Sequence, residues 1–267
     1  MKWGRVILVI FGALIITALG IDAADTIGGK EGTLLSQVIR TQGGVCPHGM
    51  VEVANIPNLT CVDIYEASTS KECPVTDPQN LLSSMQNIEN QVCTPESKSN
   101  VSPWRYITRD QAMQACARAG KRLPTNGEWY QLSLGMVNMH DACNIKTGAL
   151  APTGSYGECK TPHGAFDLVG NMWEWVSDDV IDGMYHGQQL PPEGYVAQVD
   201  QNGMATVAVD SPQLLFGSDY FWAQAEGSFG IIRGGYYDSG TDAGIYTAHA
   251  DTLPTAASAG VGFRCVK

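Results

Sequence analysis

The sequence predicts a single α+β domain with two helices, short twisted antiparallel sheets and much irregular loop, cross-linked by disulfides. Two helix starts are marked by capping boxes, in which Thr108 and Thr125 are each followed three residues later by Gln or Glu. Eight cysteines, an even number, all lie after residue 45. The 30 glycines and 13 prolines indicate many turns and long loops.

Charge and composition narrow the classes of partner. Hydrophobic residues make up 44% of the chain and charged residues only 16%, and 27 acidic residues against 16 basic ones give a net charge of −11. Because nucleic acid is a polyanion, this charge would repel it rather than attract it. We therefore expect no nucleic-acid partner.

Residues 1–20 have the layout of a secretory signal peptide, with Lys2 and Arg5 before an apolar run over 6–19 and small residues after it. The run is shorter than the roughly 20 residues that a spanning helix needs. A few further apolar residues would lengthen it, so an uncleaved membrane anchor is the alternative. Residues 21–45 are then a polar tether, and the protein is expected to be secreted or held at the cell surface by its N-terminus.

The cysteines predict four disulfides, because exported proteins fold in an oxidising compartment. No two of them lie two to four residues apart, the spacing typical of zinc ligands, so we expect no such metal site. The sequence alone leaves the pairing open. All eight cysteines lie within a predicted domain over 46–267. Proximity in sequence favours three bridges that close short loops, Cys46–Cys61, Cys73–Cys93 and Cys143–Cys159. The two remaining cysteines then form one long bridge, Cys116–Cys265.

The sequence of the first part of the domain predicts two strands and a surface loop. Residues 50–53 and 61–66 are rich in β-branched and apolar residues, and a turn around Pro57 separates them. Residues 68–103 are mostly polar and carry two cysteines. They are expected to form a disulfide-stapled surface excursion.

The two capping boxes begin helices whose apolar faces are short. In the first helix Ala112 and Cys116 fall on one face, and Gly120 supplies the left-handed residue that ends it. Cys116 should therefore point inward. In the second helix Trp129 and Leu132 form the apolar side.

The stretch after residue 170 alternates large aromatic and other side chains. Trp173 and Trp175 would share one face of a strand and pack in the core, while Met172 and Glu174 take the other face. Stacking of the tryptophans on a ligand is the alternative. The two glycines that follow Arg233 indicate close backbone approach rather than a catalytic arginine.

Three motifs resemble the sulfatase-modifying-factor family, which includes the formylglycine-generating enzymes. The motifs are Gly120 to Tyr130, Gly164 to Asp178, and Ile232 to Gly235 together with Gly262 to Cys265. They occur in the family's order, and the resemblance covers the chain from about Cys46 onward. The resemblance implies a C-type-lectin-like fold and a bridge between the first helix and the last cysteine. It also implies Asn171 and Glu174 as candidate calcium ligands, and no other metal or cofactor is expected.

The resemblance fails at the family's catalytic centre. In the formylglycine-generating enzymes, two cysteines shortly after the paired glycines bind copper and carry out the oxidation. Their counterparts here are Ser239 and Gly244, and no cysteine lies between Cys159 and Cys265. A hydroxyl or a bare backbone does not replace a thiolate as a soft copper ligand. No catalytic residue is predicted, and oxidase activity is a disfavoured alternative.

Residues 234–262 are instead expected to form a binding surface for an external protein or glycan. Tyrosine gives a large contact area for little entropy loss, and Ser, Thr, Asp and His supply adaptable hydrogen bonds. The candidate contacts are Tyr236, Tyr237, Asp238, Ser239, Thr241, Tyr246, Thr247, His249, Asp251 and Thr252. The segment also resembles the variable region of proteins diversified by retroelements. The remaining alternative is an inert structural component of the cell envelope.

Overall fold

The computed structural model describes residues 45–136 and 139–267, so the predicted leader and nearly all of the tether lie outside the described residues. Among the described residues, nine strands form one large sheet in the order β7-β6-β5-β11-β12-β10-β8-β9, with β13 beside β5. Two small sheets pair β1 with β2 and β3 with β4. The strands of the small sheets are β1 (Met50–Glu52), β2 (Cys61–Asp63), β3 (Ala67–Thr69) and β4 (Pro95–Ser97), and those of the large sheet are β5 (Trp173–Ile181), β6 (Met184–Tyr185), β7 (Gln188–Gln189), β8 (Gly194–Val199), β9 (Ala205–Val209), β10 (Tyr220–Trp222), β11 (Ser228–Arg233), β12 (Ala248–Thr252) and β13 (Val261–Gly262).

Both predicted helices are confirmed, together with their capping boxes. They are α4 (Arg109–Arg118) and α5 (Asn126–Ser133), and in each the threonine accepts from a backbone N–H while the Gln or Glu side chain accepts from the threonine N–H. Gly120 has φ of +67°, the left-handed conformation expected after α4. In the described ranges no helix is long and apolar enough to cross a bilayer.

The predicted excursion over 68–103 is stapled by the Cys73–Cys93 disulfide, and it also contains β4 and the helix α3 (Leu81–Glu89), which were not predicted. The buried residues of α3 are Ser84, Asn87 and Ile88, whereas its apolar residues Leu81, Leu82 and Met85 are exposed. Ser84 accepts a hydrogen bond from the Trp104 indole at 2.8 Å, and Asn87 exchanges hydrogen bonds with the backbone of Val75. These partners, distant in sequence, make a polar helix face stable in the interior.

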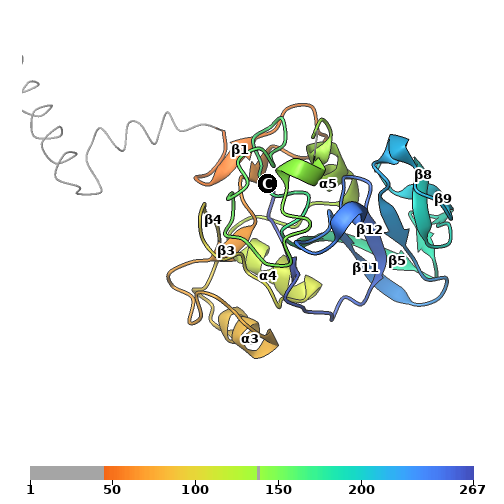
Figure 1. The fold of residues 1–267 in the computed structure, drawn as a ribbon. Coiled ribbons are helices and arrows are strands. Elements are labelled where there is room, and N and C mark those ends of the chain that lie inside the picture. The colour runs from red at the N-terminus through yellow and green to blue at the C-terminus, as the bar shows by residue number, and fades with distance from the viewer. Residues whose placement is uncertain (1–44, 137–138) are drawn as a thin grey trace, which may run out of the picture. The chain divides into compact units, whose positions relative to one another are not determined.

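Two cores lie on opposite faces of the pair β5 and β11. Trp175 and Ile232 pack on one side with α4, and Val176 and Ile231 pack on the other side with Trp129 of α5. This alternation follows from the two-residue repeat of strands. Figure 1 shows β5, β11 and β12 between the helices and the β8–β9 edge. The α+β fold class predicted from the sequence is confirmed, although α3 and the short α6 (Met139–Ala142) add to the two predicted helices.

The predicted cysteine pairing is confirmed in full. All eight cysteines lie within the described ranges and pair as Cys46–Cys61, Cys73–Cys93, Cys116–Cys265 and Cys143–Cys159. The bridge between α4 and the C-terminal segment closes 149 residues of sequence. Disulfides of this number indicate that the chain folds in an oxidising environment outside the cytoplasm.

Candidate functional site

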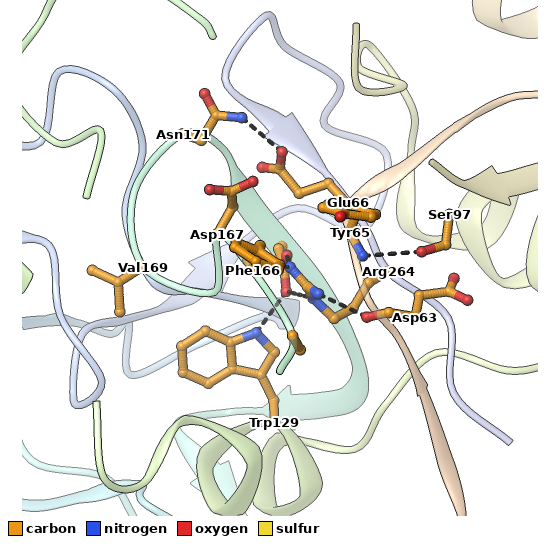
Figure 2. Close-up of polar contacts among 12 residues, drawn as sticks. Asp63, Tyr65, Glu66, Ser97, Trp129, Phe166, Asp167, Val169, Asn171 and Arg264 are labelled. Atoms are coloured by element: carbon orange, nitrogen blue, oxygen red, sulfur yellow. Dashed lines mark hydrogen bonds and ion pairs between the residues drawn. The ribbon is translucent and has the colours of Figure 1, made fainter. Parts of the chain in front are cut away.

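A buried ion pair fixes β5 to the C-terminal segment. The Arg264 guanidinium donates to both carboxylate oxygens of Glu174, with its Nε at 2.8 Å from each, and both side chains are fully buried. The Trp129 indole donates to the same carboxylate at 2.8 Å, as Figure 2 shows. The remaining guanidinium N–H groups donate to the carbonyls of Asp63 and Phe166. Glu174 is therefore fully engaged by protein donors.

Two further carboxyl groups, those of Glu66 and Asp167, lie beside this pair and are also buried. Figure 2 shows them pointing toward one another next to Asn171, whose Nδ2 donates to Glu66 at 2.6 Å. Burial, and then the nearby negative charges, raise the pKa of Glu66 well above its usual value. Burial raises the pKa of Asp167 to about 6.

The two candidate calcium ligands are occupied by protein groups. The Asn171 Oδ1 accepts from the Asn144 side chain and from the Ala151 N–H, both at 3.0 Å, and Glu174 is held by Arg264. Within the described residues, no group of three His, Cys, Asp or Glu side chains is placed to hold a metal ion. These oxygens act as structural hydrogen-bond acceptors, which leaves them no free lone pairs aimed at a shared cation.

The raised pKa of Asp167 predicts a pH-dependent stability. The unfolded chain releases this proton near pH 4, whereas the folded chain keeps it up to about pH 6, so stability falls as pH rises through this window. Asp167→Asn keeps an acceptor for the Gly154 N–H and tolerates the φ of +59°. Urea unfolding at pH 8 should show the variant to be more stable than wild type by about 1–3 kcal/mol, with no gain at pH 4.

The exposed carboxylate Glu158 provides the control for this prediction. Glu158→Gln should leave the pH dependence unchanged, since the side chain is solvated. An Asp167→Asn protein that is less stable than wild type at pH 8 would contradict the buried-charge interpretation.

The paired glycines after β11 position the predicted binding segment. A Cβ on Gly234, whose φ is +92°, would lie 2.1 Å from the Leu168 carbonyl oxygen, so only glycine allows this approach. The preceding Arg233 is fully buried, donates to the carbonyls of Gly203 and Ile245, and packs over the Trp129 ring. As predicted, the arginine and the glycines have a structural role.

A groove of about 520 Å³ lies next to these glycines. It is lined by side chains of β5, β11 and β12, by the two tyrosines that follow Gly235, and by residues between Ala256 and Val261. In β12 the small side chains of Ala248 and Ala250 face the core, which leaves His249 facing the groove. Trp173 belongs to the core and is only 7% exposed, yet it also lines the groove.

The structure brings four of the ten predicted contact residues together in this groove, namely Tyr236, Tyr237, His249 and Thr252. Asp251 lies next to them, since its carboxylate is 3.0 Å from the His249 Nδ1. The exposed residues Asp238 and Thr241 lie on the turn that follows, and Thr241 lines a separate hollow with Leu214 and Lys146.

Three of the predicted contacts have internal partners. Ser239 accepts from the Tyr236 N–H at 3.0 Å, and the Tyr246 ring packs against Phe216 with centroids 5.1 Å apart. The prediction for Thr247 is wrong, because its side chain is fully buried and donates to the Asp242 carbonyl. This residue lies in the buried stretch that precedes β12, and composition alone does not reveal that burial.

A row of aromatic rings extends from the groove across the sheet. The Trp222 ring of β10 stacks on His249 with centroids 3.9 Å apart and an interplanar angle of 8°, and His249 meets the Trp173 edge at 4.9 Å. Tyr220 lies 4.7 Å from Trp222, and Tyr195 of β8 lies 5.1 Å from Tyr220. We call these five side chains the aromatic row. No local sequence pattern predicts the row, because it depends on strand pairing.

Comparison with known proteins identifies the family. The family model described as "Sulfatase-modifying factor enzyme 1-like domain" matches residues 65–267. The chain belongs to this family. Its fold is therefore that of a sulfatase-modifying-factor domain.

Individual relatives match only in part. The formylglycine-generating enzyme of Streptomyces coelicolor is 26% identical over 194 residues, covering 61% of this chain and 52% of that protein. The serine/threonine-protein kinase pkn1 of Chlamydia caviae is 27% identical over 159 residues, covering 55% and 21%. The chain thus spans about half or less of these relatives' length.

Among solved structures, the Major Tropism Determinant I1 variant is similar at 17% identity with a TM-score of 0.45, covering 83% of this chain and 53% of that one. PvdO from Pseudomonas aeruginosa is similar at 14% identity with a TM-score of 0.40, covering 81% and 89%.

Ser239 and Gly244, the counterparts of the copper-binding cysteines of formylglycine-generating enzymes, do not fit a copper site. At Gly244 a Cβ would lie 2.1 Å from a carboxylate oxygen of Asp219, so the space that a side chain would need is filled. Asp219 is buried, accepts from the Tyr246 N–H at 2.7 Å, and has its pKa raised to about 7 by burial. The side chains at these two positions therefore supply neither the thiolates nor the room that copper needs.

Introducing cysteines at positions 239 and 244 should not create a copper site. We expect Ser239→Cys combined with Gly244→Cys to bind Cu(I) no better than wild type in competition with a chromogenic chelator, because Asp219 excludes the second side chain. Adding Asp219→Gly removes the obstruction and should give measurable binding. Copper binding by wild type, or equal binding with and without Asp219, would contradict this explanation.

Proposed function

We propose that the protein is an exported binding protein that recognises an external protein or glycan through the groove and the aromatic row. The observation that carries the proposal is the convergence of Tyr236, Tyr237, His249 and Thr252 on one groove. Concave sites lined by aromatic residues with a few polar groups are typical of ligand binding. The filled space at Gly244 argues against the family's oxidase chemistry.

The frame around the groove supports binding by pre-organisation. The glycine contact with Leu168, the buried pair of Glu174 and Arg264, and the Cys116–Cys265 disulfide hold the strands that carry the contact residues. Rigid support reduces the entropy lost on binding. Secretion, or attachment to a membrane by residues 1–20, is part of the same proposal and rests on the sequence pattern.

The proposal is tested by capture with the full chain. Wild type is screened against a glycan array and a library of purified cell-surface proteins. We expect a selective target whose affinity falls about tenfold or more in Tyr237→Ala and His249→Ala. Thr241→Ala is the matched control, since it changes an exposed residue of the same segment outside the groove. The proposal would be overturned if no selective target is found, or if the groove variants bind the target with the same affinity as wild type.

Diversification of the segment is a separate part of the proposal. It predicts closely related copies that differ mainly within residues 236–259, together with a nearby reverse-transcriptase gene and a template repeat. Sequencing the flanking DNA checks both. Uniform copies without such a gene would remove the retroelement interpretation and leave the binding proposal standing.

A further inference from the structure

Negative charge is concentrated in the part of the chain that builds the candidate site. Between residues 179 and 263 the sequence has no lysine, and its one arginine, Arg233, is fully buried. The acidic residues in the same range are Asp179, Asp182, Glu193, Asp200, Asp210, Asp219, Glu226, Asp238, Asp242 and Asp251. This region therefore carries most of the chain's net charge of −11.

Several of these carboxylates lie close to the aromatic side chains of the site. Asp251 contacts His249 at 3.0 Å, within the aromatic row. Asp238 is exposed and follows the groove residue Tyr237 directly in the chain. Glu193 lies directly before β8 and Asp210 directly after β9, next to the pairing of Tyr195 with Tyr220 and Val209. Burial, and then neighbouring groups that include Glu193, Asp242 and Asp210, raise the pKa of Tyr220. The aromatic row thus has an acidic rim.

Three basic residues of other segments are already paired with carboxylates and are therefore less available to neutralise this rim. Arg105 pairs with Asp77 at 3.4 Å and Arg109 pairs with Asp179. Beyond the tyrosines, Lys146 lies 3.6 Å from Asp141.

We propose that the aromatic row and groove bind a cationic segment of a partner protein, one that presents arginine or lysine side chains. This inference rests on the proposed function and narrows its ligand class. A guanidinium or ammonium group over the half-buried rings of Trp222 or Tyr220 gains a cation–π interaction. Carboxylates on the rim then supply hydrogen bonds and electrostatic steering. An anionic glycan is repelled by the same rim.

The inference is tested with defined probes on the full chain. An octa-arginine peptide, an octa-glutamate peptide and a neutral hexasaccharide are titrated and binding is followed by calorimetry. We expect the arginine peptide alone to bind, and to bind more weakly at about 300 mM salt than at about 50 mM. Trp222→Leu, which leaves the net charge unchanged, should weaken binding about fivefold through loss of the ring face.

Charge variants separate the rim from the general acidity of the protein. Glu193→Gln should weaken arginine-peptide binding, and Glu158→Gln, which removes one exposed charge outside the site, should not. Equal effects of the two variants, or no effect of Trp222→Leu, would show non-specific attraction and overturn the inference. Groove-dependent binding of the hexasaccharide or the glutamate peptide would overturn it and leave the proposed function intact. If no probe binds and the capture screen finds no target, both fail.

Discussion

Replacing Arg264 with methionine is expected to lower the free energy of unfolding by about 3–5 kcal/mol, because removal of one partner leaves a buried charge without compensation. Glu174 would then keep only the Trp129 indole as a donor, beside the carboxyl groups of Glu66 and Asp167. Three buried carboxyl groups would face no cation. Urea unfolding of the purified variant at pH 7 measures the loss.

The companion variants make this prediction independent of whether Arg264→Met folds well. Glu174→Gln keeps an acceptor for Trp129 and removes the charge, so the double variant should regain part of the stability lost by Arg264→Met. A loss below about 1 kcal/mol for Arg264→Met, or a double variant less stable than the sum of the single effects, would show that the pair is not the main tie between β5 and the C-terminal segment.

Removing the Cys116–Cys265 disulfide is expected to have a similarly large effect. The bridge closes 149 residues, and the chain-entropy model assigns about 4–5 kcal/mol to a loop of that length. Alanine at both positions avoids placing hydroxyl groups in a fully buried site. The free energy of unfolding of the double-alanine variant, measured in urea beside wild type, checks the value.

The Cys46–Cys61 bridge is the internal comparison, since it closes only 15 residues. Its removal should cost about 3 kcal/mol in the same model. A smaller loss from the long bridge than from the short one would contradict the entropic argument and indicate that the short bridge holds local structure.

Local features were predicted correctly from the sequence because their partners lie a few residues away. The capping boxes at Thr108 and Thr125 involve side chains and backbone within three residues. Three disulfides close short loops, and the fourth followed once these were assigned. The family motifs, which are also contiguous, predicted the fold class.

Features made by distant segments were missed for the same reason. Helix α3 buries Ser84 and Asn87, which are satisfied by Trp104 and Val75, and leaves most of its apolar side chains exposed, so its sequence pattern does not show which face is buried. The aromatic row joins Trp222 and His249 through the parallel pairing of β10 and β12, which no local pattern encodes. Glu66 and Asp167 belong to the Arg264 network only because three separate segments meet there.

The binding surface is tested most directly by hydrogen–deuterium exchange of the full chain with and without its captured target. If the groove and aromatic row are the binding surface, protection should appear in β10, β12 and residues 236–260. Protection confined to other surfaces, such as α3 or the β1–β2 hairpin, would contradict the assignment of the site.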